Sequence, residues 1–494
     1  MKTSKQQMII DNKIKNLANL ILAIFITVTP LIVVVCNVIG INAQIHKLYQ
    51  IFGVIYLIYL PFTIVLMFKQ KGAWQRILEK LKSLPVILAV ALYTLMFLNC
   101  IITNSVNIFL FYFIVYICIF ICLFTIDKKY DNLIINTLII TMSICCFLGF
   151  LDPGNKFIPG FDIGLAPLTL MFYNPNYAGY AIALLAILNI WIMCTTDNNK
   201  QRIVSIVGYI FFNVYLFMNG SFAPITGFIF TTILMIIYAW IKQKKCPTKL
   251  LISFLSIIPF IFITDAIPDI NKYRTCDYNY FIECIAVFDN IFGTKLLRMF
   301  GISQVAGSDG WGRSELQAAA LAEILSDIKI FLFGKGAGGN FYFIPHNTIL
   351  CLWLNFGIVP TLLYYAINIY LIVRFFKLKN NYNLIGYIAS NIGYLIMMMT
   401  GDLIEYSFCY HMIVFAITFR KIEQAHALQK KNEQEEHILK YVEEQKKLNQ
   451  KEEQLNTKKR KTTSSNSKKT QTNSRSSTST KNKLNQTTTP NNKG

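Results

Sequence analysis

Charged residues are scarce in this chain of 494 residues: only 15% are Asp, Glu, Lys or Arg, whereas 54% are hydrophobic. A soluble domain of this composition would lack the polar surface that it must present to water. The shortage has a local cause, because apolar runs of about 17–25 residues recur, each long enough to cross about 30 Å of hydrocarbon. These observations exclude an ordinary soluble enzyme and predict an all-α, polytopic helical membrane protein.

Acidic residues are fewer than basic ones, 26 against 47, and the basic residues are unevenly placed. They gather in alternate loops, whereas the short loops between them hold only Lys47 and Lys156. Because cytoplasmic loops carry the excess of Lys and Arg, this pattern predicts that both termini are cytoplasmic. About twelve transmembrane helices are predicted, roughly at 17–36, 49–68, 85–103, 107–126, 133–151, 176–194, 203–219, 223–241, 250–264, 347–373, 384–400 and 406–419.

Metal-binding patterns are also missing. The chain has five His, no HExxH motif and no Cys/His spacing typical of a metal site, so we predict no metal and no cofactor. Most of the 12 Cys lie in or beside the apolar runs, where a thiol behaves as a small hydrophobe. Cys276 and Cys284 lie instead in a long outside loop, and the sequence leaves open whether they form a disulfide.

The predicted spans divide the chain into five parts. Residues 1–264 hold transmembrane helices 1–9, 265–345 form a large extracytoplasmic loop, 346–419 hold helices 10–12, 420–457 form a cytoplasmic charged helix, and 458–494 form a disordered basic tail. Within the loop, Arg313–Ile330 has helical periodicity. One face of that helix collects the apolar residues Leu316, Ala320, Leu321, Ile324 and Leu325.

The basic tail has ten Lys or Arg and no acid between residues 458 and 494. On the cytoplasmic side, such a segment is most simply a contact with anionic lipid headgroups, in preference to nucleic acid. The helix before it places Tyr441, Leu448 and Leu455 seven residues apart, a spacing that fits either a coiled coil or a solvated helix.

A glycine-rich turn lies near the end of the large loop. Residues 333–340 (FGKGAGGN) contain a literal G-x-G-x-x-G, but no strand–turn–helix unit surrounds it, so a dinucleotide site is not indicated. Two interpretations remain. The segment is either a flexible turn, or a place where backbone N–H groups at Gly334 and Gly336 approach an anionic phosphate.

Two charged or titratable residues flank this turn. His346 precedes Asn347 at the start of an apolar helix, and its imidazole could accept a proton or hold a phosphate oxygen, although a lone His is more often structural. Arg313 begins the loop helix, where a cation is less favourable than an acid. It is either a solvated charge or a group that grips a diphosphate, and Arg298 is a weaker candidate for the same task.

The run GRSELQAAALAEILSDIKIFLFGKGAGGNFYFIPHNTILCLWLNFGIVP resembles the signature region of the O-antigen ligase/polymerase superfamily. Members have a Gly-Arg, a helix, a Gly-x-Gly turn, a His-Asn and a membrane helix interrupted by a glycine, here Gly357. Asn176, within Asn174-Pro175-Asn176 ahead of a span, is similar to another family feature. The detailed match covers about fifty residues and the topology covers about 420. The chain departs from the family at Ser221-Phe222-Ala223, where many members have Ser-Arg-Gly.

The resemblance implies glycan transfer at the outer face of the cytoplasmic (inner) cell membrane. The donor would be a glycan on undecaprenyl diphosphate, and the acceptor a glycan or glycolipid. Arg313 would hold the diphosphate, His346 would deprotonate the acceptor hydroxyl or bind the same phosphate, and Asn347 would orient sugar or imidazole. Transfer would be metal-independent and inverting. The sequence does not separate a ligase from a surface-polysaccharide polymerase.

Two other classes of protein also fit a many-span chain. A glycolipid flippase or exporter would often show internal repeats and charged residues within its spans, and this chain shows neither. A membrane scaffold would depend on the basic tail.

Overall fold

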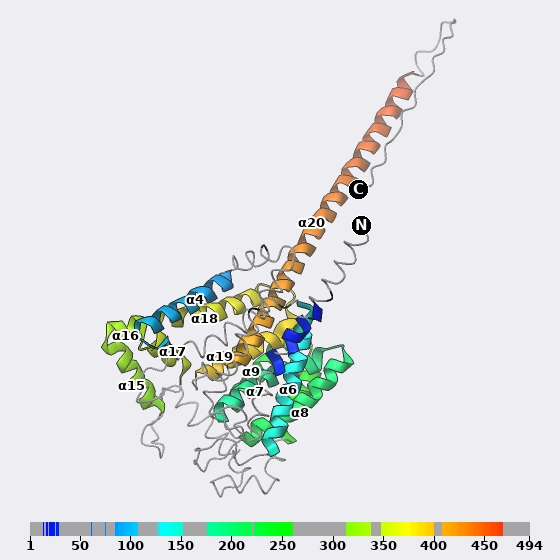
Figure 1. Cartoon of the computed structure of the whole chain (residues 1–494). Coiled ribbons are helices and arrows are strands. Elements are labelled where there is room, and N and C mark those ends of the chain that lie inside the picture. Colours follow the sequence, from blue (N-terminus) through cyan, green and yellow to red (C-terminus); the bar gives the residue numbers. More distant parts are fainter. Residues whose placement is uncertain are drawn as a thin grey trace, which may run out of the picture. The chain divides into compact units, whose positions relative to one another are not determined.

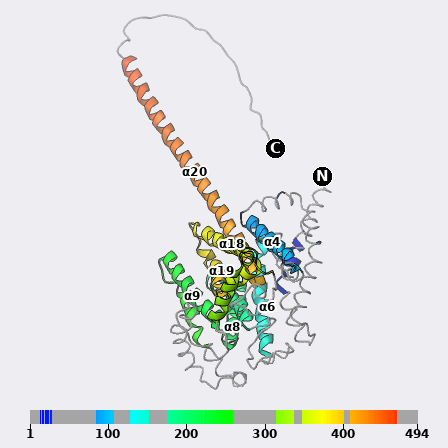
Figure 2. The same cartoon turned by 90° about the vertical axis from the view of Figure 1, so that its left-hand side faces the viewer.

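Helices are the regular structure of the chain. The computed structural model describes residues 84–106, 126, 128–151, 175–219, 222–259, 313–336, 347–399 and 408–467, with isolated positions or short runs among 13–28, 61 and 75. Within these ranges there are helices and no strands (Figure 1; Figure 2). The predicted all-α class is confirmed for this part of the chain.

Five of the described helices are long and apolar enough to cross a membrane by their length and composition. They lie in α4 (Leu84–Ile102), α6 (Asp131–Leu151), α7 (Pro175–Thr195), α9 (Phe222–Gln243) and α18 (Ile358–Phe376). The other elements are η1 (Lys128–Tyr130), α8 (Asn199–Asn219), α10 (Thr248–Leu255), α15 (Arg313–Ser326), α16 (Ile328–Phe333), α17 (Thr348–Phe356), η3 (Tyr382–Leu384), α19 (Ile385–Met398) and α20 (Phe408–Ser467). The predicted spans 17–36, 49–68 and 107–126 fall mostly outside the described residues.

Helix α7 is at the centre of the packing, with neighbours α8, α9 and α19. Glycines allow the closest approaches. A Cβ at Gly386 of α19 would lie 2.1 Å from Cγ of Trp191, and a Cβ at Gly208 of α8 would lie 2.5 Å from Ile139. Small residues are enriched where membrane helices pack, because they let two helix backbones approach closely and gain van der Waals contact.

Buried polar side chains tie α7 to α8 and α19, and α19 to α20. Asn189 Nδ2 donates to the carbonyl of Ser205 at 2.8 Å, and Ser390 Oγ donates to the carbonyl of Leu184 at 2.6 Å. Asn391 Nδ2 donates to Thr418 Oγ1 at 3.0 Å. A polar group far from water is costly unless it has a partner, so these bonds fix which helix faces meet.

Several predicted helices are interrupted. The predicted span 250–264 begins as α10, which ends at Leu255 with Ser256 as its C-cap, and residues 260–264 lie outside the described residues. The loop helix predicted over Arg313–Ile330 is two helices. Asp327 separates α15 from α16 and caps α16 by accepting a hydrogen bond from Lys329 N at 2.8 Å. The predicted glycine interruption is confirmed, because α17 ends at Phe356 and α18 begins after Gly357.

Helix α20 is longer than predicted. It joins the predicted last span and the charged helix and continues to Ser467, so residues 458–467 of the predicted disordered tail are helical. An established helix extends at little cost through residues that include no Gly or Pro. The remaining residues, 468–494, lie outside the described residues.

The chain divides into two units, Met1–His426 and Ala427–Gly494. In the second unit, the helix is exposed and charged, with i,i+4 pairs at Lys431–Glu435 (3.6 Å) and Lys440–Glu436 (2.8 Å). Tyr441 and Leu448 are exposed there, as they would be both in a solvated helix and in a single strand of a coiled coil.

Ion pairs anchor the end of α20 that belongs to the first unit. Arg420 pairs with Asp131 at the start of α6, and both side chains are almost fully buried. Arg420 Nη1 also donates to the carbonyl of Ile126 at 3.2 Å. Nearby, Arg374 Nη2 lies 2.9 Å from Glu423 Oε1, in a more exposed pair. These contacts join α6, α18 and α20.

Candidate functional site

The glycine turn after α16 binds the end of α17. Lys335 N donates to the carbonyl of Leu354 at 2.7 Å, and Gly336 N donates to that of Asn355 at 2.8 Å. Asn99 Nδ2 of α4 lies 3.4 Å from the next carbonyl, that of Phe356. A helix end leaves its last carbonyls without partners, and the break at Gly357 would do so inside an apolar environment. The turn and Asn99 supply the missing donors.

Glycine is required at three points of this contact. Gly334, Gly336 and Gly357 have φ of +68°, +93° and +86°. A Cβ at Gly334 would lie 2.4 Å from the backbone carbon of Asn355, and one at Gly357 would lie 2.0 Å from the carbonyl oxygen of Leu332. Because both obstacles are backbone atoms, no side-chain rotation would relieve the overlap. The turn and the helix break can therefore pack this closely only if Gly334 and Gly357 are glycines.

A small apolar core holds α15 against α17. Ala320 and Ile324 of α15 are fully buried with Leu354 of α17. Trp353 Nε1 donates to the carbonyl of Phe331 at 3.0 Å, and the two rings meet edge to face at 5.1 Å. The predicted apolar face of α15 is therefore only partly right, because Leu321 and Leu325 are 41% and 61% exposed.

An ion pair between Lys335 and Glu323 connects the glycine turn to α15. Each side chain is about one-quarter exposed, at 26% and 27%. The backbone of Lys335 binds α17 while its side chain binds α15, so this one residue fixes the turn to both helices. We name the assembly of α15, α16, the turn 334–336 and α17 the loop–helix unit.

Asn347 caps the start of α17. Its Oδ1 accepts hydrogen bonds from Ile349 N at 2.9 Å and Leu350 N at 3.3 Å, the arrangement of a helix N-cap. The residue predicted to orient a sugar or an imidazole thus has its side-chain oxygen bonded to the helix. His346 precedes this cap but lies outside the described residues.

For two of the other predicted site residues, the structure describes the helix but not the side chain. Arg313 is the first residue of α15 and Asn176 lies in the first turn of α7, but their side chains are outside the described residues. Arg298, Cys276 and Cys284 also lie outside them. The loop–helix unit therefore joins the helix that Arg313 begins to the helix that follows His346.

The backbone N–H groups of the turn have acceptors within the protein. Gly334 N donates to the carbonyl of Ile330 at 2.8 Å, in addition to the bonds made by Lys335 and Gly336. These bonds favour an ordered turn over a flexible one at the three residues. These N–H groups cannot bind a phosphate while they donate to protein carbonyls. Gly334 and Gly336 therefore matter because they have no side chain, which lets the turn pack closely.

Sequence reasoning missed the end of α4. A Cβ at Gly336 would lie 2.1 Å from Thr103 Oγ1 and 2.6 Å from Ser105 Oγ, so this polar end abuts the turn. Thr103 Oγ1 and Ser105 Oγ are 2.9 Å apart. The signal was a polar cluster, Asn99 and Thr103-Asn104-Ser105, at the end of an otherwise apolar run.

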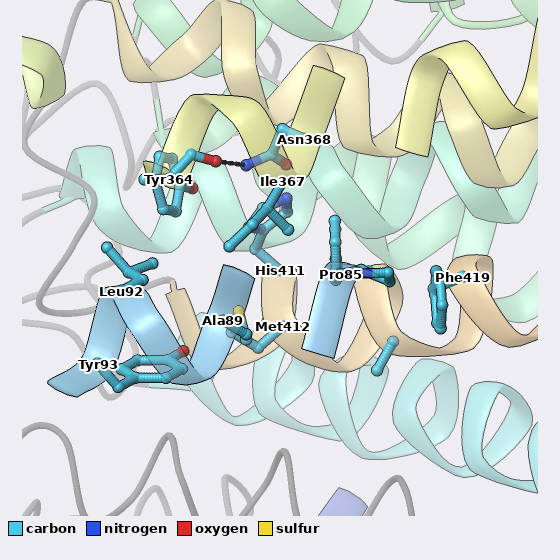
Figure 3. Close-up of a pocket in the computed structure, with 12 residues that line it drawn as sticks. Pro85, Ala89, Leu92, Tyr93, Tyr364, Ile367, Asn368, His411, Met412 and Phe419 are labelled. Carbon is cyan, nitrogen blue, oxygen red and sulfur yellow. Dashed lines mark hydrogen bonds between the residues drawn. The ribbon is translucent and has the colours of Figure 1, made fainter. Parts of the chain in front are cut away.

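A pocket lies elsewhere, between α4, α18 and α20. Figure 3 shows His411, Asn368 and Tyr364 among its lining residues. The His411 ring stacks on Tyr394 with centroids 4.1 Å apart, and Asn368 Nδ2 donates to the carbonyl of Tyr364 at 2.9 Å. The cavity measures about 30 Å³, which is too small for a sugar. We do not place the glycan site there.

Among the described residues, no three His, Cys, Asp or Glu side chains are grouped so as to hold a metal ion. Comparison of the chain with protein-family models and with curated proteins found no match. The class that the fold defines is an all-helical protein with five described helices that could cross a membrane.

Proposed function

We propose that this protein is a multi-pass glycosyltransferase of the cytoplasmic membrane, with both termini in the cytoplasm. It would move a glycan from an undecaprenyl-diphosphate carrier to an acceptor at the outer face. The observation that carries the proposal is the loop–helix unit. It packs α15, whose first residue is Arg313, against α17, which follows His346.

The proposed reaction is a displacement at the anomeric carbon. The acceptor oxygen forms the new glycosidic bond while the bond from that carbon to the diphosphate oxygen breaks. The acceptor proton passes to His346, and undecaprenyl diphosphate leaves with the bonding electrons. Arg313 offsets the charge that grows on the leaving diphosphate, because its planar fork can bond two oxygens at once.

Contacts between helix ends support the proposed alternation of spans. Cys194 Sγ lies 3.3 Å from Ser253 Oγ, and both residues belong to helix ends predicted to be cytoplasmic. The Arg374–Glu423 pair joins two further predicted cytoplasmic ends. Gly336 meets Thr103, and both are predicted outside. Reversing any one of these helices would put contacting residues on opposite sides.

Replacing His346 with Ala should lower the rate of glycan transfer by about 100-fold or more, because general-base catalysis typically contributes that much. Arg313→Ala should cost a similar factor through lost stabilisation of the leaving diphosphate. The measurement is transfer by purified protein given lipid-linked glycan and an acceptor. Lys329→Ala is the matched control, an exposed cation on α16 that should leave the rate unchanged. Full activity in both site variants would contradict the assignment.

The acceptor distinguishes a ligase from a polymerase. Cells lacking a ligase should accumulate long lipid-linked chains, whereas cells lacking a polymerase should accumulate single repeats. Movement of lipid-linked glycan across vesicles without transfer would instead identify a carrier.

A chain ending after Leu428 should transfer glycan within about twofold of the full chain, because removing exposed residues leaves the packed unit intact. The contacts of Arg420, Glu423 and His426 would remain, including the 2.8 Å contact of His426 Nε2 with the carbonyl of Arg374. A chain ending after Phe419 is the matched control and should lose activity, since it lacks Arg420. If the longer truncated chain were inactive although inserted, the helix beyond Leu428 would be essential. The charged helix and the basic tail would then be needed for function, as expected of a membrane scaffold.

A further inference from the structure

The outward face of α15 and α16 is apolar. Leu321, Leu325 and Ile328 are 41%, 61% and 66% exposed, and Leu332 and Phe333 of α16 are 39% and 49% exposed. These five large side chains follow one another along two consecutive short helices. An exposed apolar surface of this kind marks a contact with a membrane or another molecule.

Exposed polar residues interrupt this face only at the junction of the two helices, at Ser326, Asp327 and Lys329. Between Leu316 and Leu325 the only polar residues of α15 are Gln317 and Glu323, and Glu323 pairs with Lys335. The inward face, with Ala320 and Ile324, is apolar as well. A helix of an aqueous loop normally turns charges outward, and one that is apolar on both faces is normally covered on both.

The apolar face of α15 and α16 lies near the end of α4. The turn that follows α16 abuts Thr103 and Ser105, immediately after α4 ends at Ile102. Ile101 and Ile102 are 50% and 69% exposed. On α18, which packs against α4, Val359 and Leu362 are 46% and 60% exposed. The apolar face of α15–α16 therefore lies at the same end of the helix group as the outward apolar residues of two candidate spans.

Helix direction agrees with this placement. In Figure 1, α15 runs across the direction of α4 and α18 rather than along it. If α4 and α18 cross the membrane, a helix that runs across these two at their end lies near the plane of the membrane surface. Helices with an apolar face in that position bury it at the boundary between headgroups and acyl chains.

We propose that α15 and α16 form an in-plane membrane anchor whose face, Leu321, Leu325, Ile328, Leu332 and Phe333, is covered by lipid acyl chains. The inference rests on the membrane location proposed above, but not on glycan transfer. Lipid is the occupant that the position favours, because the outward apolar residues of α4 and α18 lie at the same end. The anchor would hold the loop–helix unit at the depth where the headgroup of a lipid-linked substrate lies.

The test is depth-dependent quenching of an environment-sensitive fluorophore. Leu325→Cys and Ile328→Cys variants of the full chain would each be labelled with nitrobenzoxadiazole and placed in lipid nanodiscs. Unsubstituted protein, labelled in parallel, gives the background from the native cysteines. Leu362→Cys on α18 is the lipid-facing control, and Gln434→Cys, on the exposed charged part of α20, is the aqueous control.

Phosphatidylcholine carrying a doxyl group at acyl carbon 5 should quench both labels about as strongly as the Leu362 label, and several-fold more than the Gln434 label. Iodide in water should quench them weakly. Strong iodide quenching would overturn the inference, and so would protection from both quenchers, which would indicate a protein partner or a second copy. If the Leu362 label also escaped lipid quenching, the proposed membrane location would fail with it.

Discussion

Replacing Arg420 with Met should lower the free energy of unfolding by about 3–5 kcal/mol, the usual cost of leaving a buried charge without its partner. Arg420 and Asp131 have side chains only 6% and 4% exposed, so water cannot replace the lost contact. Stability is measured by heating purified protein in detergent and recording the fraction that remains monodisperse at each temperature.

Two comparisons make this result specific to the pair. Arg420→Met combined with Asp131→Leu should recover much of the stability, because two apolar residues of similar volume can replace a buried pair. Arg374→Met, which breaks the more exposed pair with Glu423, should cost only about 1 kcal/mol or less. If the double variant were as unstable as Arg420→Met alone, the unpaired charge would not be the cause.

Replacing Gly357 with Val should cost about 3 kcal/mol or more and abolish the proposed glycan transfer. The φ of +86° and ψ of 176° place Gly357 in a conformation that is essentially restricted to glycine. The added Cβ would also meet the carbonyl of Leu332 at 2.0 Å, which pushes the glycine turn off α17. Stability in detergent and transfer activity should therefore fall together.

Val359→Ala is the matched control for Gly357→Val. It changes an apolar residue of α18 two positions after Gly357, and its side chain is 46% exposed, so we expect almost no effect. Normal stability in the Gly357→Val protein would mean that the helix break tolerates a side chain. The close fit of turn and break would then be unimportant.

Local patterns predicted much of the fold. The apolar runs that gave α4, α6, α7 and α9 were correctly located, and the helix break at Gly357 was expected. The separation of α15 from α16 could have been found, because Ser326-Asp327 is a typical N-cap sequence before a new helix. The continuation of α20 could also have been found, since no Gly or Pro occurs between Phe408 and Ser467.

Contacts between distant parts of the chain could not be predicted from such patterns. Nothing near Asp131 indicates that Arg420 is its partner, and nothing near Asn99 indicates Phe356. In the candidate site, only the chemistry of their side chains and their resemblance to a family motif indicated Arg313, His346 and Asn347. The capping role of Asn347 follows from its place before an apolar helix, but the bonds of Lys335 and Gly336 to α17 depend on a turn that only tertiary packing positions.

The loop–helix unit and the Arg420–Asp131 pair also differ in when they can form during synthesis. Trp353 and Phe331 are 22 residues apart in sequence, whereas Arg420 and Asp131 are 289 apart. Contacts between near neighbours in sequence have a small loop-closure cost and form early. The loop–helix unit can therefore close soon after α17 is made, while the ion pair must wait until synthesis reaches residue 420. In a growing chain, the contacts of Arg420, Glu423 and His426 would be among the last of the packed unit to form.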